Sequence, residues 1–209
     1  MADPILPGLI LAGIVLPGRG ASVSGGGPTP PSDGRWTFPI PAWRGYAPTV
    51  SDGYSATATS GHREHHGCDL MYHRKPGGAD QMWPRGIVNG KANGSPNYFM
   101  PDGVHACAAR DGTLWSVSKT GHGLAVVIDH GAPFATFYTH LSSVLFPFVE
   151  RGAQAIKVKA GQPLGVVGYS PLDAERLMHL HFEVWYKGGS SAHVDPWPLL
   201  ERAPLPTGG

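Results

Sequence analysis

The residues with the greatest potential for chemistry lie between positions 61 and 70, in the run GHREHHGCDL. This run holds three histidines, one aspartate and one cysteine, and their imidazole, carboxylate and thiolate groups are common metal ligands. Such a dense group indicates a metal site. Because so short a run cannot close a tetrahedral site by itself, at least one ligand must come from another part of the chain.

His65 and Asp69 are the best placed of these residues. They flank a glycine, and the residues that follow, CDLMYH at 68–73, are typical of a strand, so we expect a loop that runs into a strand. In that arrangement one imidazole and one carboxylate can converge. We interpret His62 and His66 as exposed loop residues.

A second group of candidates lies in MHLHFEVWY, residues 178–186. Strand alternation places an apolar set on one face and a polar or aromatic set on the other. The apolar set is Met178, Leu180, Phe182 and Val184; the other is His179, His181, Glu183 and Trp185. Alternate side chains are roughly 6 to 7 Å apart, so one imidazole can bind a metal while the other bonds to a metal-bound water. The alternative is a surface strand with two solvated histidines.

The third candidate is His140 in FYTHL, residues 137–141. Alternation predicts that Tyr138 and His140 share one face of a strand. A lone histidine at a strand end is more often structural than catalytic, and we interpret His130 as a structural turn residue.

These side chains must be positioned by a mainly β fold. The chain has 209 residues, of which 30 are glycine and 21 are proline, so turns must be frequent and elements short. We predict an all-β fold with mainly antiparallel sheets. Expected strands cover residues 112–118, 123–131, 134–141, 155–161, 162–170 and 178–186, with a hairpin connection at 131–133. A formal charge of +1 gives no reason to expect nucleic acid as the main partner.

Composition also predicts the domain boundaries. Residues 1–34 are expected to be an apolar arm followed by a Gly/Pro-rich linker, residues 35–200 a single domain, and residues 201–209 a flexible tail. Residues 72–103 hold too many helix and strand breakers for regular structure and are expected to form a long loop. The apolar run of the arm follows an aspartate and is bracketed by prolines, so we expect neither a signal peptide nor a transmembrane segment.

The two cysteines, Cys68 and Cys107, are too few for a disulfide framework. A single bridge is one alternative, but we favour two buried thiols, because free cysteine is among the most buried residue types.

Three motifs, taken together, carry a resemblance to a known family. They are RxHxGxDL at 63–70, YxHL at 138–141 and HLHFEV at 179–184, supported by DGTL at 111–114, VVIDHG at 126–131 and VKAGQPLGVVGYS at 158–170. In this order they resemble the motifs of the lysostaphin-type, LytM-like zinc endopeptidases of peptidoglycan. The resemblance covers residues 63–186 and implies a barrel-sandwich domain whose long loops wall a groove.

The resemblance also implies site residues. It gives His65, Asp69 and His181 as the ligands of one catalytic Zn²⁺, with a water in the fourth place, and His140 and His179 as catalytic histidines that do not bind the metal. Zinc makes hydroxide available near neutral pH, and the two histidines would orient or deprotonate the nucleophile, stabilise the oxyanion and protonate the leaving amine. The division of these roles stays open, and we interpret Glu183 as a supporting or structural residue.

The chain departs from the family pattern where loops would face the substrate. YSATATSGHRE at 54–64 and SPLDAERLM at 170–178 replace an FGxR-like turn and a glycine-rich stretch, and the loop at 72–103 is long. These differences bear on which bond is cut, and both a D-alanyl to diaminopimelate cross-link and a glycine bridge suit the chemistry.

We therefore expect an endopeptidase that cuts peptide cross-links of peptidoglycan and acts at the bacterial cell wall. Its expected partners are stem peptides or cross-bridges. Docking of the N-terminal arm onto a larger assembly, such as a phage tail tip or baseplate, would deliver such a lysin without a signal peptide. The alternatives are a catalytically silent structural or wall-binding subunit and a non-haem iron oxygenase, whose site also uses two histidines and a carboxylate.

Overall fold

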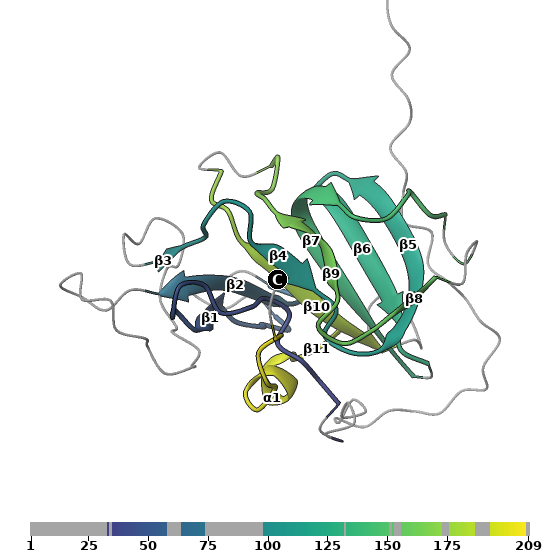
Figure 1. The fold of residues 1–209 in the computed structure, drawn as a ribbon, viewed down its shortest axis with the longest axis horizontal. Helices are drawn as coiled ribbons and strands as arrows, with labels where there is room; N and C mark the ends of the chain where they lie inside the picture. The colour runs from purple at the N-terminus through teal and green to yellow at the C-terminus, as the bar shows by residue number, and fades with distance from the viewer. Residues whose placement is uncertain are drawn as a thin grey trace, which may run out of the picture.

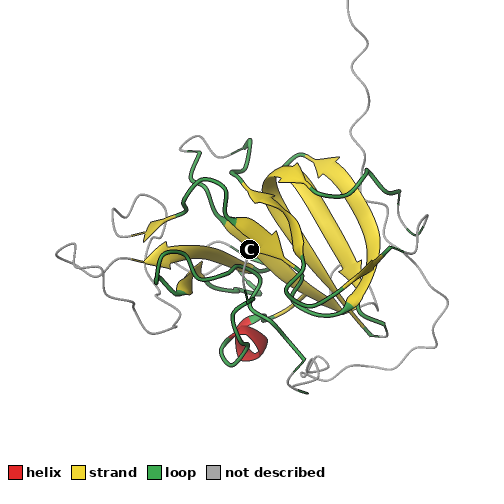
Figure 2. Ribbon diagram, in the orientation of Figure 1, coloured by secondary structure: helices red, strands yellow, loops and turns green. Residues whose placement is uncertain are grey.

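The computed structural model describes residues 33, 35–57, 64–73, 98–131, 133–150, 152, 156–172, 176–186 and 193–207. Within these residues the regular structure is strand, apart from one short helix (Figure 2). All pairs of named strands in the described residues are antiparallel. The predicted all-β, mainly antiparallel fold is therefore confirmed.

The elements are short, as the glycine and proline content predicts. In chain order they are β1 (Pro48–Asp52), β2 (Cys68–His73), β3 (Tyr98–Phe99), β4 (His105–Cys107), β5 (Gly112–Thr120), β6 (Gly123–Asp129), β7 (Phe134–Val144), β8 (Lys157–Val158), β9 (Pro163–Val167), β10 (Leu180–Tyr186), β11 (His193–Val194) and α1 (Trp197–Leu200).

The described strands form one 11-stranded sheet whose main order is β1-β2-β10-β7-β6-β5-β8. β3 pairs with β2, β11 pairs with β10, and β9 pairs with β4 and with the end of β7. The late strand β10 therefore lies between the early strand β2 and the central strand β7 (Figure 1). This arrangement brings three distant parts of the sequence side by side.

The expected strands agree with the observed ones. The ranges 112–118, 123–131 and 134–141 correspond to β5, β6 and β7, and the three later ranges contain β8, β9 and β10. The strand predicted at 68–73 is β2. β6 and β7 pair as the expected hairpin, although residue 132 of its connection lies outside the described residues.

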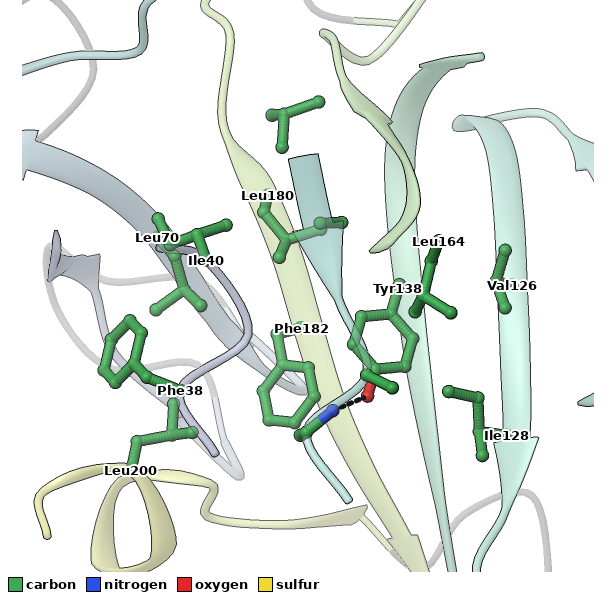
Figure 3. Close-up of a cluster of buried hydrophobic side chains, with 14 of the residues drawn as sticks. Phe38, Ile40, Leu70, Val126, Ile128, Tyr138, Leu164, Leu180, Phe182 and Leu200 are labelled. Carbon is green, nitrogen blue, oxygen red and sulfur yellow. Dashed lines mark hydrogen bonds between the residues drawn. The ribbon is translucent and has the colours of Figure 1, made fainter. Parts of the chain in front are cut away.

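The core is built from one face of β2, β10, β7 and β6. Leu70, Leu180, Phe182 and Tyr138 are fully buried there, and Leu164 of β9 belongs to the same cluster (Figure 3). Full burial of a large apolar side chain contributes about 1.5–3 kcal/mol. The apolar face predicted for residues 178–186 is thus confirmed as a core face.

The end of the described chain packs against the domain instead of forming the flexible tail expected from residue 201 onwards. Leu200 and Ala203 are buried, and Pro204 accepts a hydrogen bond of 2.8 Å from the backbone N–H of Phe38. The physical reason is that Leu200 and Ala203 belong to the core cluster, and Leu200 of α1 lies beside Phe38 (Figure 3). Residues 208–209 lie outside the described part.

Other expectations fall partly or wholly outside the described residues. The predicted arm and linker at 1–34 lie outside the described residues except for residue 33. Residues 74–97 of the expected loop also lie outside the described residues. The ends of that loop are more regular than expected, because Tyr72 and His73 belong to β2 and pair with β3. No helix among the described residues reaches the length and hydrophobicity that crossing a membrane requires.

Both cysteines are free thiols and both are buried. Cys68 points into the core from β2, on the opposite side of the strand from Asp69. The preference for two buried thiols is confirmed, and Cys68 is not placed to share a metal with Asp69.

Candidate functional site

The register between β2 and β10 sets the first two site residues. Asp69 lies directly opposite His181 in this antiparallel pair, while their neighbours Leu70 and Leu180 face the core. His65 precedes β2 and pairs with Ser55 through two backbone hydrogen bonds of 2.8 and 2.9 Å. That bridge holds the His65 ring beside the polar face of the sheet.

Three side-chain atoms converge at this point. Asp69 Oδ1 lies 2.9 Å from His181 Nδ1 and 3.2 Å from His65 Nε2, and the two ring nitrogens are 3.1 Å apart. Ligand atoms bound tetrahedrally at about 2.0–2.1 Å from zinc are roughly 3.3 Å from one another. The spacing of these atoms therefore fits a shared zinc ion.

Hydrogen bonds on the far side of each ring leave these two nitrogens as acceptors. His65 donates its Nδ1–H to the carbonyl of Gly53 at 2.8 Å, and His181 donates its Nε2–H to the carboxylate of Glu183 at 2.8 Å. When the rings are neutral, Nε2 of His65 and Nδ1 of His181 therefore present lone pairs to each other and to Asp69. The two ring nitrogens and the Asp69 oxygen are then three acceptors with no donor among them, and a cation bound between them would satisfy all three.

The electrostatics of the group lead to the same conclusion. Burial lowers the pKa of His181, but the flanking carboxylates of Asp69 and Glu183 outweigh it and raise that pKa to about 10. Burial would raise the pKa of Asp69, yet His179, His181 and His65 hold it well below its ordinary value. The site therefore keeps Asp69 ionised and favours a positive charge, carried by either a proton or a metal.

His140 reaches this site through a β-bulge in β7. Thr139 and His140 together lie opposite the single residue Ala125 of β6, and His140 has a φ of 65°. A bulge with one residue in the left-handed region redirects the side chains that follow it, and such bulges are frequent beside active sites. The centroid of the His140 ring is 4.6 Å from that of His179 and 5.7 Å from that of His181.

The prediction that Tyr138 and His140 share one face is wrong for this reason. Tyr138 points into the core, where its hydroxyl accepts a hydrogen bond of 2.8 Å from the backbone N–H of Ala109. His140, two residues later, points to the opposite side, beside His179. Simple alternation cannot anticipate the extra residue of the bulge.

Gly168 ties the backbones of the two histidines together. Its N–H donates to the carbonyl of His140 at 2.7 Å, and its carbonyl accepts from the N–H of His179 at 3.0 Å. Each imidazole also has its Nδ1 engaged: His140 donates to the carbonyl of His122 at 2.8 Å, and His179 to the carbonyl of Leu177 at 2.9 Å. Nε2 of both rings is left for the site, and in His179 it lies 3.7 Å from Asp69 Oδ2.

The structure therefore brings all five predicted site residues together. His65, Asp69, His140 and His179 are buried, and the His181 side chain is 13% exposed. Burial, followed by the neighbouring His179, lowers the pKa of His140 to about 4, so this imidazole is neutral at pH 7 and can accept a proton. A cation site with an adjacent neutral imidazole can support metal-assisted hydrolysis. Zinc binding and catalysis by these residues remain predictions.

The other candidates lie apart from this group. His66 lies on the loop before β2 with its side chain 42% exposed, so it is less exposed than expected, whereas His62 lies outside the described residues. His130 bonds to the carbonyl of Asp111 at 2.9 Å and to Thr136 Oγ1 at 2.7 Å, which agrees with a structural turn residue.

His193 is a residue that sequence reasoning missed. It lies in β11 opposite Trp185, and its Nδ1 is 3.1 Å from Oε2 of Glu183, the carboxylate that holds His181. Burial would raise the pKa of Glu183, but the hydrogen bond from His181 and the adjacent His193 ring lower it to about 2. Only the pairing of β11 with β10 makes this contact visible, since the short run around His193 has no motif of its own.

Comparison with protein families gives a match to the model of peptidase family M23 over residues 93–196, about half of the chain. The matched range contains His140, His179 and His181. His65 and Asp69 precede it and join the site through the pairing of β2 with β10. No curated protein matches the chain.

Solved structures share the fold. A chain in the crystal structure of the SpoIIIAH and SpoIIQ complex is 20% identical with a TM-score of 0.52, and the match covers 78% of this chain and 98% of that one. Csd3 from Helicobacter pylori is 21% identical with a TM-score of 0.50, covering 83% of this chain and 35% of Csd3.

The catalytic domain of the antimicrobial peptidase lysostaphin from Staphylococcus simulans is 21% identical, with a TM-score of 0.48 and coverage of 72% of this chain and 90% of that one. In a second structure of lysostaphin the match covers 52% of that chain, so this chain spans about half of that relative and about a third of Csd3. From the family match and the three ordered motifs, we conclude that the chain belongs to peptidase family M23, the lysostaphin-type metallopeptidases.

Proposed function

We propose that this protein is a zinc-dependent endopeptidase that hydrolyses peptide cross-links of bacterial peptidoglycan. The observation that carries the proposal is the convergence of His65 Nε2, Asp69 Oδ1 and His181 Nδ1, all within 4.8 Å of one another, beside two further imidazoles. Membership of a peptidase family supplies the reaction class, and the sequence resemblance supplies the substrate class.

His65, Asp69 and His181 would hold the zinc ion. A zinc ion bound there would act as a Lewis acid towards the scissile carbonyl and would lower the pKa of water to about 7. The protein's part is to keep the three ligand atoms together. The Gly53 carbonyl and the Glu183 carboxylate do this by binding the far nitrogen of each ligand histidine.

His140 and His179 would carry the proton transfers. Backbone carbonyls fix Nδ1 of each ring as the protonated nitrogen, so each ring offers Nε2 to a bound peptide. From that position an imidazole can take the proton of the attacking water, hydrogen-bond the oxyanion and return a proton to the leaving amine.

The proposal extends to where the enzyme acts. Such a substrate would require it to act at the bacterial cell wall, as a virion-associated component of a phage tail or as a free lytic hydrolase. In the first case residues 1–34 would dock onto the tail assembly, and deletion of residues 1–30 would prevent incorporation into particles. Unchanged incorporation after that deletion would exclude a docking role for the arm.

Mass spectrometry of fragments released from purified sacculi tests the enzymatic proposal. Sacculi with direct cross-links and sacculi with glycine bridges are each treated with wild type, with His140→Ala, and with wild type plus chelator. Conversion of cross-linked muropeptides to monomers by untreated wild type alone is expected, and the fragment masses would identify the bond. If every type of sacculus stayed intact despite bound zinc, a silent structural or wall-binding subunit would be the better description.

A further inference from the structure

The carboxylate of Glu183 is held on both of its oxygens. Oε1 accepts the Nε2–H of His181 at 2.8 Å, whereas Oε2 accepts the indole N–H of Trp185 and lies 3.1 Å from Nδ1 of His193. Glu183 itself is 8% exposed. A buried carboxylate with donors on both oxygens has one favoured orientation.

Short strand β11 places the ring of His193 beside this carboxylate, with Nδ1 3.1 Å from Oε2. His193 pairs with Trp185 across the antiparallel β10–β11 ladder, so its side chain lies on the same face as Glu183. The ring of His66 stacks on that of His193, with centroids 4.1 Å apart and an interplanar angle of 18°. The hydroxyl of Tyr54 donates to the carbonyl of His193 at 3.4 Å, next to Gly53, whose carbonyl holds His65.

The orientation of His181 depends on this arrangement. A histidine ring can turn about its Cβ–Cγ bond and present a different nitrogen to the site. Glu183 favours the orientation with Nε2–H towards itself, and this leaves Nδ1 2.9 Å from Asp69. A carboxylate that was free to rotate would give a weaker preference.

We propose that Glu183 and His193 are positioning residues that fix His181 with Nδ1 directed at Asp69 and His65. The inference rests on the proposed zinc site and deepens it, because it assigns a role to β11, which none of the three motifs includes. His193 acts through Glu183, whose Oε2 lies 3.1 Å from its Nδ1.

The test compares variants that differ in the polar group placed beside Glu183 by position 193. His193→Asn keeps an N–H at the distance of Nδ1 from the backbone, His193→Ala removes it, and His66→Ala removes only the stacked neighbour. Glu183→Ala removes the carboxylate, with Glu183→Gln as its replacement if the alanine variant does not fold. Circular dichroism checks the fold of each variant.

Zinc affinity, measured by competition with a chromophoric chelator, is the first readout. Loss of a hydrogen-bond partner of a ligand histidine weakens metal binding by about 10- to 100-fold. We expect zinc affinity to fall by about 10- to 100-fold in Glu183→Ala and by about tenfold in His193→Ala. In His193→Asn and His66→Ala we expect zinc affinity to stay within about twofold of wild type.

The second readout needs no metal. In zinc-free protein, the Nε2 proton of His181 should give a downfield NMR signal protected from exchange in wild type, His193→Asn and His66→Ala. The signal should be lost in Glu183→Ala and His193→Ala. Unchanged affinity and signal in His193→Ala, or equal losses in the alanine and asparagine variants, would overturn the inference.

The two readouts separate this inference from the proposed function. If wild type bound no zinc while the proton signal followed the predicted pattern, the zinc enzyme would be excluded and the positioning of His181 by Glu183 and His193 would stand.

Discussion

Asp69 and His181 lie directly opposite each other on β2 and β10, and their side chains meet at 2.9 Å between Oδ1 and Nδ1. The same register places Leu70 opposite Leu180 in the core. A slip of one residue would turn Asp69 into the core and Leu70 into the site. Burial of the core face therefore stabilises the register that assembles the candidate metal site.

Gly67 should be intolerant of a side chain. A Cβ at this position would lie 2.4 Å from the backbone oxygen of Phe182 and 2.9 Å from Cγ of Glu183. Because these atoms belong to β10, Gly67→Ala must push β10 away from the chain that leads into β2. We expect the free energy of unfolding, measured by urea denaturation, to fall by about 1–3 kcal/mol.

Gly121→Ala is the matched control for this substitution. A Cβ there would have nothing within 4 Å, and the backbone does not adopt a positive φ. Its free energy of unfolding should change by less than about 1 kcal/mol. Equal effects of the two substitutions would show that Gly67 does not lie against β10.

Because of the bulge at His140, we expect glycine to be more stable than alanine at this position, the reverse of the usual order in a strand. Glycine within a strand is ordinarily less stable than alanine by about 0.5–1 kcal/mol. At a φ of 65°, however, alanine carries the left-handed penalty of about 1–2 kcal/mol that glycine avoids. Urea denaturation should therefore find His140→Gly more stable than His140→Ala, by about 1 kcal/mol. The ordinary order, with alanine more stable, would contradict the bulge.

The two thiols should not react in the folded protein. Cys68 and Cys107 have relative exposures of 0% and 2%, and burial raises the pKa of Cys107 to about 11 and that of Cys68 further. Since the thiolate is the reactive form, a chromogenic disulfide reagent at pH 8 should titrate both thiols only after denaturation. Rapid reaction of either one under native conditions would place it at the surface.

Metal content should separate the ligands from the other histidines. Wild type and His140→Ala should each contain one zinc per chain by elemental analysis, because the His140 ring is outside the three-ligand group. Asp69→Ala removes one ligand atom and should weaken binding by at least about 100-fold. Iron in place of zinc would favour the oxygenase alternative. Retention of zinc by Asp69→Ala would exclude the Asp69 carboxylate as a ligand.

Much of this architecture is predictable from alternation. The pattern of residues 178–186 correctly places Leu180 and Phe182 in the core and His181 on the opposite face, because both faces of a regular strand follow from its period. The strand that starts at Cys68 is likewise visible from its residue types. The resemblance then identifies which distant histidines belong with Asp69.

Two features of the site are not predictable in this way. The face of the sheet to which His140 points depends on one extra residue in β7 relative to β6. Such a bulge is a property of the pairing between two strands, so it cannot be read from the sequence pattern of either strand alone. His193 lies in a strand of two residues whose partner is set by long-range pairing. The packing of Ala203 and Pro204 against the domain depends on long-range contacts in the same way.

Anomalous X-ray diffraction at the zinc absorption edge would show whether His65, Asp69 and His181 hold one zinc ion. A single anomalous peak is expected about 2 Å from His65 Nε2, Asp69 Oδ1 and His181 Nδ1, with His140 and His179 outside bonding distance. A peak bound by His140 or His179, or crystals grown with zinc that show no peak at this position, would contradict this expectation.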